Sequence, residues 1–148
     1  MFKHILVSTD GSKLSGKAIR TAVKLATATG AKVTGVYVMA PYELPAYAEA
    51  MTYGQGISPK RYKFVTKRDA RKALAVVEIE ARAAKIEYGS VMLTADSPWK
   101  GIIRAAKAKK CNLVVMSSHG RRGLAALLLG SETTKVLTHS KIPVLVCR

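Results

Sequence analysis

Cysteine and histidine are scarce in this chain of 148 residues, which contains only two cysteines and three histidines. Cys111 precedes one expected strand and Cys147 ends the last one. Parallel strands would hold the two sulfur atoms on the order of 15 Å apart at ~3.3 Å per residue, so we expect no disulfide. The histidines are widely separated and have no metal-site spacing, so the sequence also argues against a metal centre.

Long apolar runs are missing too. No window approaches the ~20 apolar residues that a membrane span requires. The first residues, MFKHILV, carry a short apolar run that is typical of a strand and not of a signal peptide. We therefore expect a cytoplasmic protein with no membrane partner. Apolar residues still make up 49% of the composition, which predicts one globular domain over residues 1–148.

Acidic residues are few, with 9 Asp and Glu against 25 Lys and Arg and a formal net charge of +16. Such a charge attracts polyanions such as nucleic acid, nucleotides or anionic lipid, but a solvated basic surface would look the same. The basic residues are spread over several expected helices. They are not interleaved with aromatic side chains, as a platform for stacked bases would require. The sequence therefore argues against nucleic acid as a partner.

Strand and helix patterns alternate along the chain. We expect strands at about 3–9, 32–39, 90–95, 112–118 and 142–147, and helices at about 13–29, 59–87, from 98 onward and at 131–139. Ser12 is expected to cap the first helix, Gly30 and Gly89 to end the first and second, and Ser131 to cap the last. The order βαβαβαβαβ predicts an α/β fold, a single-domain Rossmann-like, doubly wound five-stranded parallel sheet. Residues 40–57 have no clear period and form either a lid or partner surface or a variable insertion.

Ligands of such sheets bind beyond the carboxyl ends of the strands, where the strand order reverses. Two polar segments, 8–11 and 117–120, lie at such ends and would face each other if their strands are neighbours. Val38 would line the side of this crevice. Gly130 and Ser131 open a helix whose exposed N–H groups suit a phosphate. The chain lacks both a Walker A lysine and a dinucleotide-binding glycine pattern, and Asp10 is equally compatible with an ordinary turn.

The segments ILVSTDGSKLSGKAIRTAVKLA and VVMSSHGRRGLAALLLGSETTKVLTHSKIPVLV resemble the two ends of the universal stress protein family, and the resemblance covers the whole chain. Members that bind ATP carry Gly-x2-Gly-x9-Gly-(Ser/Thr). Gly120, Gly130 and Ser131 match its last three elements, whereas Ser117 stands in place of the first glycine. The Ser117 side chain either crowds the ribose or donates a hydrogen bond to it.

The resemblance implies an adenine nucleotide alpha hydrolase-like fold and an adenine nucleotide as ligand, ATP or else AMP or ADP. The base and ribose would be contacted by Asp10, the Val38 backbone and neighbouring residues, and the phosphates by the start of the last helix. Mg²⁺ would enter on the phosphates, with Asp10 the nearest carboxylate. The candidate site residues are Ser8, Thr9, Asp10, Val38, Met116, Ser117, His119, Gly120, Arg121, Gly130, Ser131, Glu132 and Thr133.

Several of these residues allow two interpretations. Glu132 suits the helix dipole but repels a polyphosphate, and Arg121 and Arg122 either offset that charge or face solvent. His119 next to Ser118 is an acid–base candidate, although a loop histidine near a ligand more often donates a hydrogen bond. No catalytic constellation stands out from the sequence.

Three functions are compatible with these residues. The first is a nucleotide-binding regulatory module of the stress response without evident catalysis. The second is a stress-response interaction module that binds no nucleotide, and the third is a slow ATP hydrolase. The apolar strand 143–147 would lie at a sheet edge, and the resemblance implies that it pairs with a second copy in a homodimer. The alternative is an edge shielded by the tyrosine-rich segment 40–57.

Overall fold

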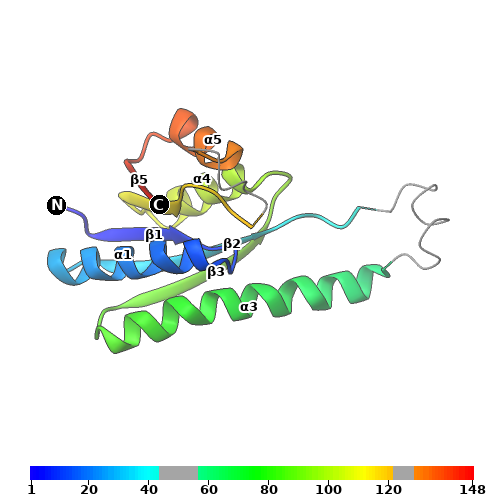
Figure 1. Cartoon of the computed structure of the whole chain (residues 1–148), viewed down its shortest axis with the longest axis horizontal. Coiled ribbons are helices and arrows are strands. Elements are labelled where there is room, and N and C mark those ends of the chain that lie inside the picture. Colours follow the sequence, from blue (N-terminus) through cyan, green and yellow to red (C-terminus); the bar gives the residue numbers. More distant parts are fainter. Residues whose placement is uncertain (44–56, 122–128) are drawn as a thin grey trace.

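A computed structural model describes residues 1–43, 57–121 and 129–148 of the chain. Its strands are β1 (His4–Ser8), β2 (Lys32–Met39), β3 (Tyr88–Thr94), β4 (Leu113–Ser117) and β5 (Val144–Cys147). They form one parallel sheet in the order β3-β2-β1-β4-β5 (Figure 1). The predicted α/β fold is confirmed, and β1 and β4 are neighbours, as the crevice between segments 8–11 and 117–120 requires.

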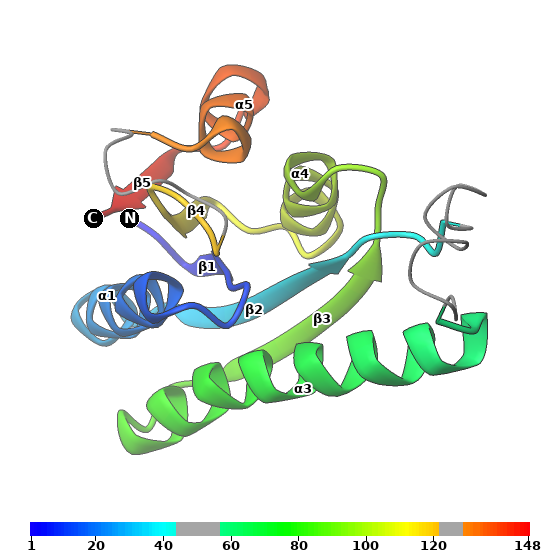
Figure 2. The ribbon, with the colours of Figure 1, turned by 45° about the vertical axis from the view of Figure 1, so that its right-hand side comes forward.

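The helices cover both faces of the sheet. They are α1 (Lys13–Thr29), α3 (Pro59–Ala83), α4 (Pro98–Ala108) and α5 (Ser131–His139). Helices α1 and α3 lie on one face and α4 and α5 on the other (Figure 2). Successive side chains of a strand point to opposite faces, so Ile5 and Val7 pack under α1 while Leu6 packs with Ile102 of α4. The core is therefore divided into two layers by the sheet.

Local sequence signals set several helix ends. The Ser12 hydroxyl accepts a hydrogen bond from the Ser15 N–H at 3.1 Å, and Gly30 ends α1 in the left-handed conformation with φ 68°. Ser58 caps α3 in the same way, with Pro59 at its first helical position. These ends agree with the predicted ones.

Three details of the prediction are wrong. Helix α3 ends at Ala83 and not near 87, because Lys85 turns the chain with φ 57°, and Gly89 lies inside β3, opposite Thr34. The N-cap of α5 is Gly130, so Ser131 is the first helical residue.

The predicted segment 40–57 falls mostly in 44–56, outside the described residues.

Two glycines allow helices to approach β2 closely. A Cβ on Gly101 of α4 would lie 2.7 Å from both Cγ atoms of Val38, and one on Gly35 would lie 2.8 Å from Cγ2 of Val77 in α3. Only a residue without a side chain fits such contacts. Gly101 therefore brings α4 down onto the carboxyl end of β2.

Among the described helices, none is both long and apolar enough to cross a membrane.

Candidate functional site

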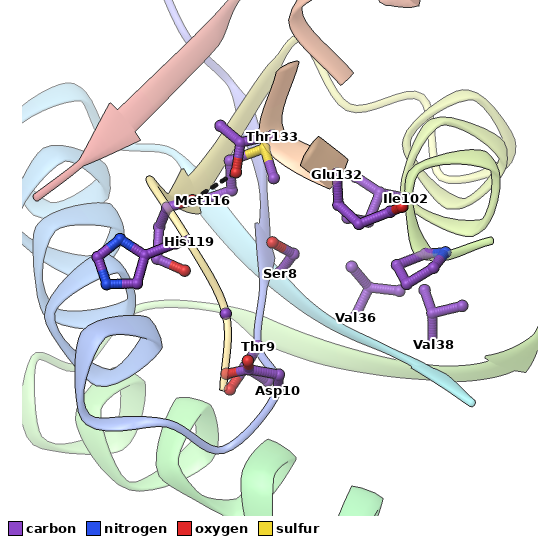
Figure 3. A pocket seen from close by; sticks show the side chains of 13 residues that line it. Ser8, Thr9, Asp10, Val36, Val38, Ile102, Met116, His119, Glu132 and Thr133 are labelled. Atoms are coloured by element: carbon purple, nitrogen blue, oxygen red, sulfur yellow. Dashed lines mark hydrogen bonds between the residues drawn. The ribbon is translucent and has the colours of Figure 1, made fainter. Parts of the chain in front are cut away.

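A cavity of about 170 Å³ opens at the carboxyl ends of β1, β2 and β4, beside the first turns of α4 and α5 (Figure 3). Its lining residues are Ser8, Thr9, Asp10, Val36, Val38, Pro98, Ile102, Met116, Ser117, His119, Gly120, Glu132 and Thr133. Both polar segments singled out in the sequence contribute to it. The strand order reverses between β1 and β4, so the cavity lies at the switch point of the sheet.

One side of the cavity is apolar. Val36 and Val38 of β2 lie together with Ile102 of α4 in Figure 3, and Pro98 and Met116 are further apolar residues of the lining. Val36 is fully buried and Ile102 nearly so. A wall of aliphatic side chains suits the faces of a flat ring, because packing against it removes the apolar faces of the ring from water and requires no hydrogen bond.

The backbone of Val38 adds a polar edge to this wall. The Lys32 N–H donates to the Lys3 carbonyl at 3.1 Å and the Thr9 N–H donates to the Val36 carbonyl at 3.0 Å, so even-numbered residues of β2 direct their peptide groups toward β1. Strand β1 ends at Ser8, opposite Val36. The N–H and C=O of Val38 therefore extend past the end of β1, and within the described residues no backbone group pairs with them.

Asp10 ties the turn after β1 to the loop after β4. Its Oδ1 accepts the Ser12 N–H at 2.9 Å and its Oδ2 accepts the Arg121 N–H at 2.8 Å. Burial alone would raise the pKa of Asp10, but these hydrogen bonds together lower the pKa below its ordinary value of 3.8. A Cβ on Gly120 would lie 2.7 Å from Oδ2, so the carboxylate position requires glycine there.

The hydroxyls of Ser8, which ends β1, and of Thr9, which follows it, have different surroundings. Thr9 is buried; its hydroxyl lies 3.1 Å from the Ser15 hydroxyl and accepts the Gly11 N–H. Ser8 is half-buried, and Figure 3 shows its hydroxyl inside the cavity. Thr9 therefore holds the turn in place, whereas Ser8 faces the space that a ligand would fill.

The first turn of α5 is held against the end of β4. The Thr133 hydroxyl donates to the Ser117 carbonyl at 3.0 Å, and the Gly130 N–H donates to the Ser118 carbonyl at 2.6 Å. A Cβ on Gly130 would lie 3.2 Å from the His119 Cα. The N-cap of α5 is a glycine, which offers no side-chain cap, so the first N–H groups of the helix lack that partner, and Glu132 and Thr133 of this turn line the cavity. This is the arrangement that favours an anion.

Glu132 lies in the same turn, and its carboxylate points toward α4. Its Oε2 accepts the Trp99 N–H at 2.9 Å, and its Oε1 lies 3.5 Å from Lys135 Nζ. The N-cap of α4, Ser97, makes no side-chain cap hydrogen bond. Glu132, which belongs to α5, therefore serves as the side-chain cap of α4. The helix dipole of α4 and Lys135 both offset its negative charge.

The model of the universal stress protein family matches residues 1–148 of the chain. The chain belongs to the universal stress protein family. Universal stress protein YxiE of Bacillus subtilis is 31% identical over 151 residues, covering all of both chains. A universal stress protein of Methanocaldococcus jannaschii is 30% identical over 151 residues, covering all of this chain and 83% of the relative.

Solved members of the family share the fold. A universal stress protein solved in complex with cAMP matches with a TM-score of 0.71 and 24% identity, over 99% of this chain and 97% of the other. One from Archaeoglobus fulgidus in complex with dAMP matches with a TM-score of 0.72 and 18% identity, over 99% and 98%. At these identities the likeness concerns the fold.

Ten of the thirteen predicted site residues of this universal stress protein line the cavity, and Arg121, Gly130 and Ser131 do not. The Arg121 guanidinium lies over Gly11, where an added Cβ would be 2.6 Å from Nη2, so its side chain does not bring positive charge into the cavity. Arg122 lies outside the described residues. The His119 ring is 3.2 Å from the Ser118 hydroxyl and points away from Ser8 in Figure 3.

Three lining residues were not predicted from the sequence: Val36, Pro98 and Ile102. Val36 could have been found, because it lies two residues before Val38 on the same face of β2. Pro98 and Ile102 belong to α4, which follows a strand at the edge of the sheet. No motif in the sequence indicates that this helix reaches the cavity.

Proposed function

We propose that this protein is an adenine-nucleotide-binding regulatory module of the stress response, with ATP as ligand and Mg²⁺ entering on its phosphates. The observation that carries the proposal is the order of parts in one cavity. An apolar wall with the open peptide edge of Val38 is followed by the hydroxyl of Ser8 and then by the uncapped start of α5. These parts match a base, a ribose and a phosphate in turn.

The base would lie between the aliphatic side chains of β2 and α4. Adenine presents an acceptor nitrogen beside an amino donor, which complements a backbone N–H and C=O pair such as that of Val38. Asp10 lines the cavity and supports this site by fixing the two loops. The family members solved with cAMP and dAMP support adenine as the base.

The phosphates would lie at the first turn of α5, where the N–H groups of Ser131, Glu132 and Thr133 are available. Ser117 is small and largely buried, and its carbonyl is already occupied by Thr133. A side chain of this size would leave room for a ribose beside it. Within the described lining, both carboxylates accept backbone N–H groups, which favours binding over general-base chemistry.

The test begins with protein purified without added nucleotide. Denaturation and mass analysis of the released small molecules identify any ligand, and ATP·Mg²⁺ is then titrated into the emptied protein. Gly120→Val should remove binding because its side chain meets the Asp10 carboxylate, and Gly130→Ala should weaken binding by about tenfold or more by moving α5. Gly16→Ala is the control, because its Cβ lies in ordinary contact at 3.6 Å from Arg20 Nη1.

An interaction module without nucleotide is the second candidate. The observation that favours it is the carboxylate of Glu132, which lines the cavity close to the expected phosphates. An empty protein that fails to bind millimolar ATP would establish this alternative and overturn the nucleotide proposal.

We infer in addition that β5 joins two copies of the chain through residues 143–147. Strand β5 ends the sheet and pairs with β4 on one edge only, and Leu145 is 37% exposed. An open apolar edge strand tends to pair with another chain. Leu145→Lys should shift the protein from dimer to monomer in light scattering coupled to gel filtration, whereas Leu137→Lys on the surface of α5 should leave the mass unchanged.

A further inference from the structure

The outer side of α1 carries a stripe of exposed basic residues: Lys13, Lys17, Arg20 and Lys24. Their spacing of four, three and four residues places them on one side of the helix, opposite the buried Ile19 and Ala22. Helix α1 contains no acidic residue, and within the described part of the chain none of the four forms an ion pair. The outer side of α1, which faces away from the sheet, therefore carries a row of positive charges without acidic partners among the described residues.

Helix α3 continues this surface. Its first fourteen residues include seven basic ones: Lys60, Arg61, Lys63, Lys67, Arg68, Arg71 and Lys72. Asp69 is the single acidic residue of that stretch, and it pairs with Arg68 at 3.1 Å. The buried side of α3 begins at Ala70, so the preceding turns extend past the strands, as Figure 1 shows.

Both helices lie on the same side of the sheet (Figure 2). Together they carry twelve basic and three acidic residues, a net of nine of the sixteen formal positive charges of the chain. We call this surface the α1/α3 face. The charge of the protein is therefore concentrated on one layer, which the sequence alone did not indicate.

Two large apolar side chains project from this basic surface. Phe64 is 67% exposed and Ile79 is 65% exposed, both on α3. Phe64 is surrounded on the helix by four basic residues, at the positions three and four before it and four and seven after it: Lys60, Arg61, Arg68 and Arg71. A phosphate backbone offers no apolar surface to such a side chain, whereas the interface of a lipid bilayer offers both phosphates and acyl chains.

We propose that the α1/α3 face docks this protein on membranes rich in anionic phospholipid. Phe64 enters the headgroup layer, and the lysine and arginine side chains around it contact lipid phosphates. Peripheral binding of this kind requires no membrane-spanning segment. The proposal is independent of the nucleotide cavity, which opens among β1, β2, β4, α4 and α5.

The test is sedimentation of the full chain with lipid vesicles at low and high salt. Vesicles with about one third phosphatidylserine should bind the protein, pure phosphatidylcholine should not, and binding should fall steeply between about 0.1 and 0.5 M salt. Arg61→Glu with Arg68→Glu should lower the partition coefficient on the order of tenfold or more. Phe64→Ser should lower it about fivefold without changing the net charge.

Matched controls lie outside the α1/α3 face. Lys107→Glu with Lys141→Glu changes the charge equally, and Leu137→Ser removes an apolar side chain that is 41% exposed on α5. Both controls should retain most of the binding. The proposal is overturned by absence of vesicle binding, by equal losses in the control variants, or by duplex DNA binding that exceeds vesicle binding and does not respond to Phe64→Ser. Circular dichroism of each variant shows whether it is folded.

Discussion

Glu132 and Trp99 join the two helices that border the cavity. The Oε2 atom of Glu132, in the first turn of α5, accepts the Trp99 N–H at 2.9 Å in the first turn of α4. The Trp99 ring in turn lies 4.5 Å from the ring of His139, at the other end of α5. One acidic side chain therefore caps α4 and also places a negative charge in the cavity wall.

Because the Glu132 carboxylate both caps α4 and lines the cavity, we predict that Glu132→Gln tightens ATP·Mg²⁺ binding. Glutamine keeps an oxygen for the Trp99 N–H but removes a charge that repels the phosphates. We expect affinity to rise about threefold to tenfold, since a nearby charge at a helix terminus contributes ~1 kcal/mol. Trp99 is the single tryptophan of the chain, so its fluorescence can follow the titration.

Glu132→Ala is the comparison that separates the two effects. It removes the charge and the cap together, so the free energy of unfolding should fall by ~1 kcal/mol, as for other lost caps. Equal ATP affinities for wild type and Glu132→Gln would show that the carboxylate does not face the phosphates.

Asp10 predicts a pH dependence of stability. Its hydrogen bonds to the Ser12 and Arg121 N–H groups hold the pKa of the folded state below the ordinary value of 3.8. The ionised form therefore stabilises the fold fully above pH 3.8, and this contribution is lost as the pH falls through the lower folded pKa.

Urea unfolding of wild type and Asp10→Asn at a series of pH values measures this effect. The difference in the free energy of unfolding should be constant near neutral pH and shrink below pH 3.8. A difference that persists unchanged into strong acid would contradict the assignment.

The two thiols should differ in reactivity. Burial raises the pKa of the Cys111 thiol to about 11, while Cys147 at the end of β5 is only half-buried. Because the thiolate is the reactive form, a thiol reagent at neutral pH should modify Cys147 first and Cys111 only when the protein unfolds. Mass analysis of peptides from briefly treated protein checks this, and early modification of Cys111 would show that its surroundings open readily.

Local signals in the sequence account for most of the fold. The limits of α1 follow from the Ser12 cap and from Gly30, both of which act through neighbouring backbone. The end of α3 was missed because Lys85 adopts the left-handed conformation that glycine usually supplies. A lysine at such a position carries no signal in a single sequence.

The candidate site was predictable where it is built from strand ends. Asp10 follows β1 and Ser117 ends β4, and the strand order brings them to one edge of the sheet. Ile102 and the direction of the Glu132 carboxylate depend on how α4 packs, which is a tertiary property. The same holds for Arg121, whose guanidinium lies over Gly11 outside the cavity.

Gly101 is the residue on which the position of α4 depends, so Gly101→Ala should disturb both stability and binding. The added Cβ would lie 2.7 Å from both Cγ atoms of Val38 and 2.8 Å from Leu93 Cδ1, which forces α4 away from β2. We expect a loss of about 1–3 kcal/mol in the free energy of unfolding, the usual range for an overpacked core. Nucleotide affinity should also fall, since Val38 and Ile102 form the wall for the base.

The matched control is Gly16→Ala in the first turn of α1, where the nearest atom, Arg20 Nη1, lies 3.6 Å from the added Cβ. Alanine there should stabilise the helix by about 0.5–1 kcal/mol and leave nucleotide binding unchanged. Chemical unfolding and ATP titration of both variants distinguish the two sites. A Gly101→Ala protein as stable as wild type would mean that α4 can shift on β2 freely, and the apolar wall would then not be a rigid part of the site.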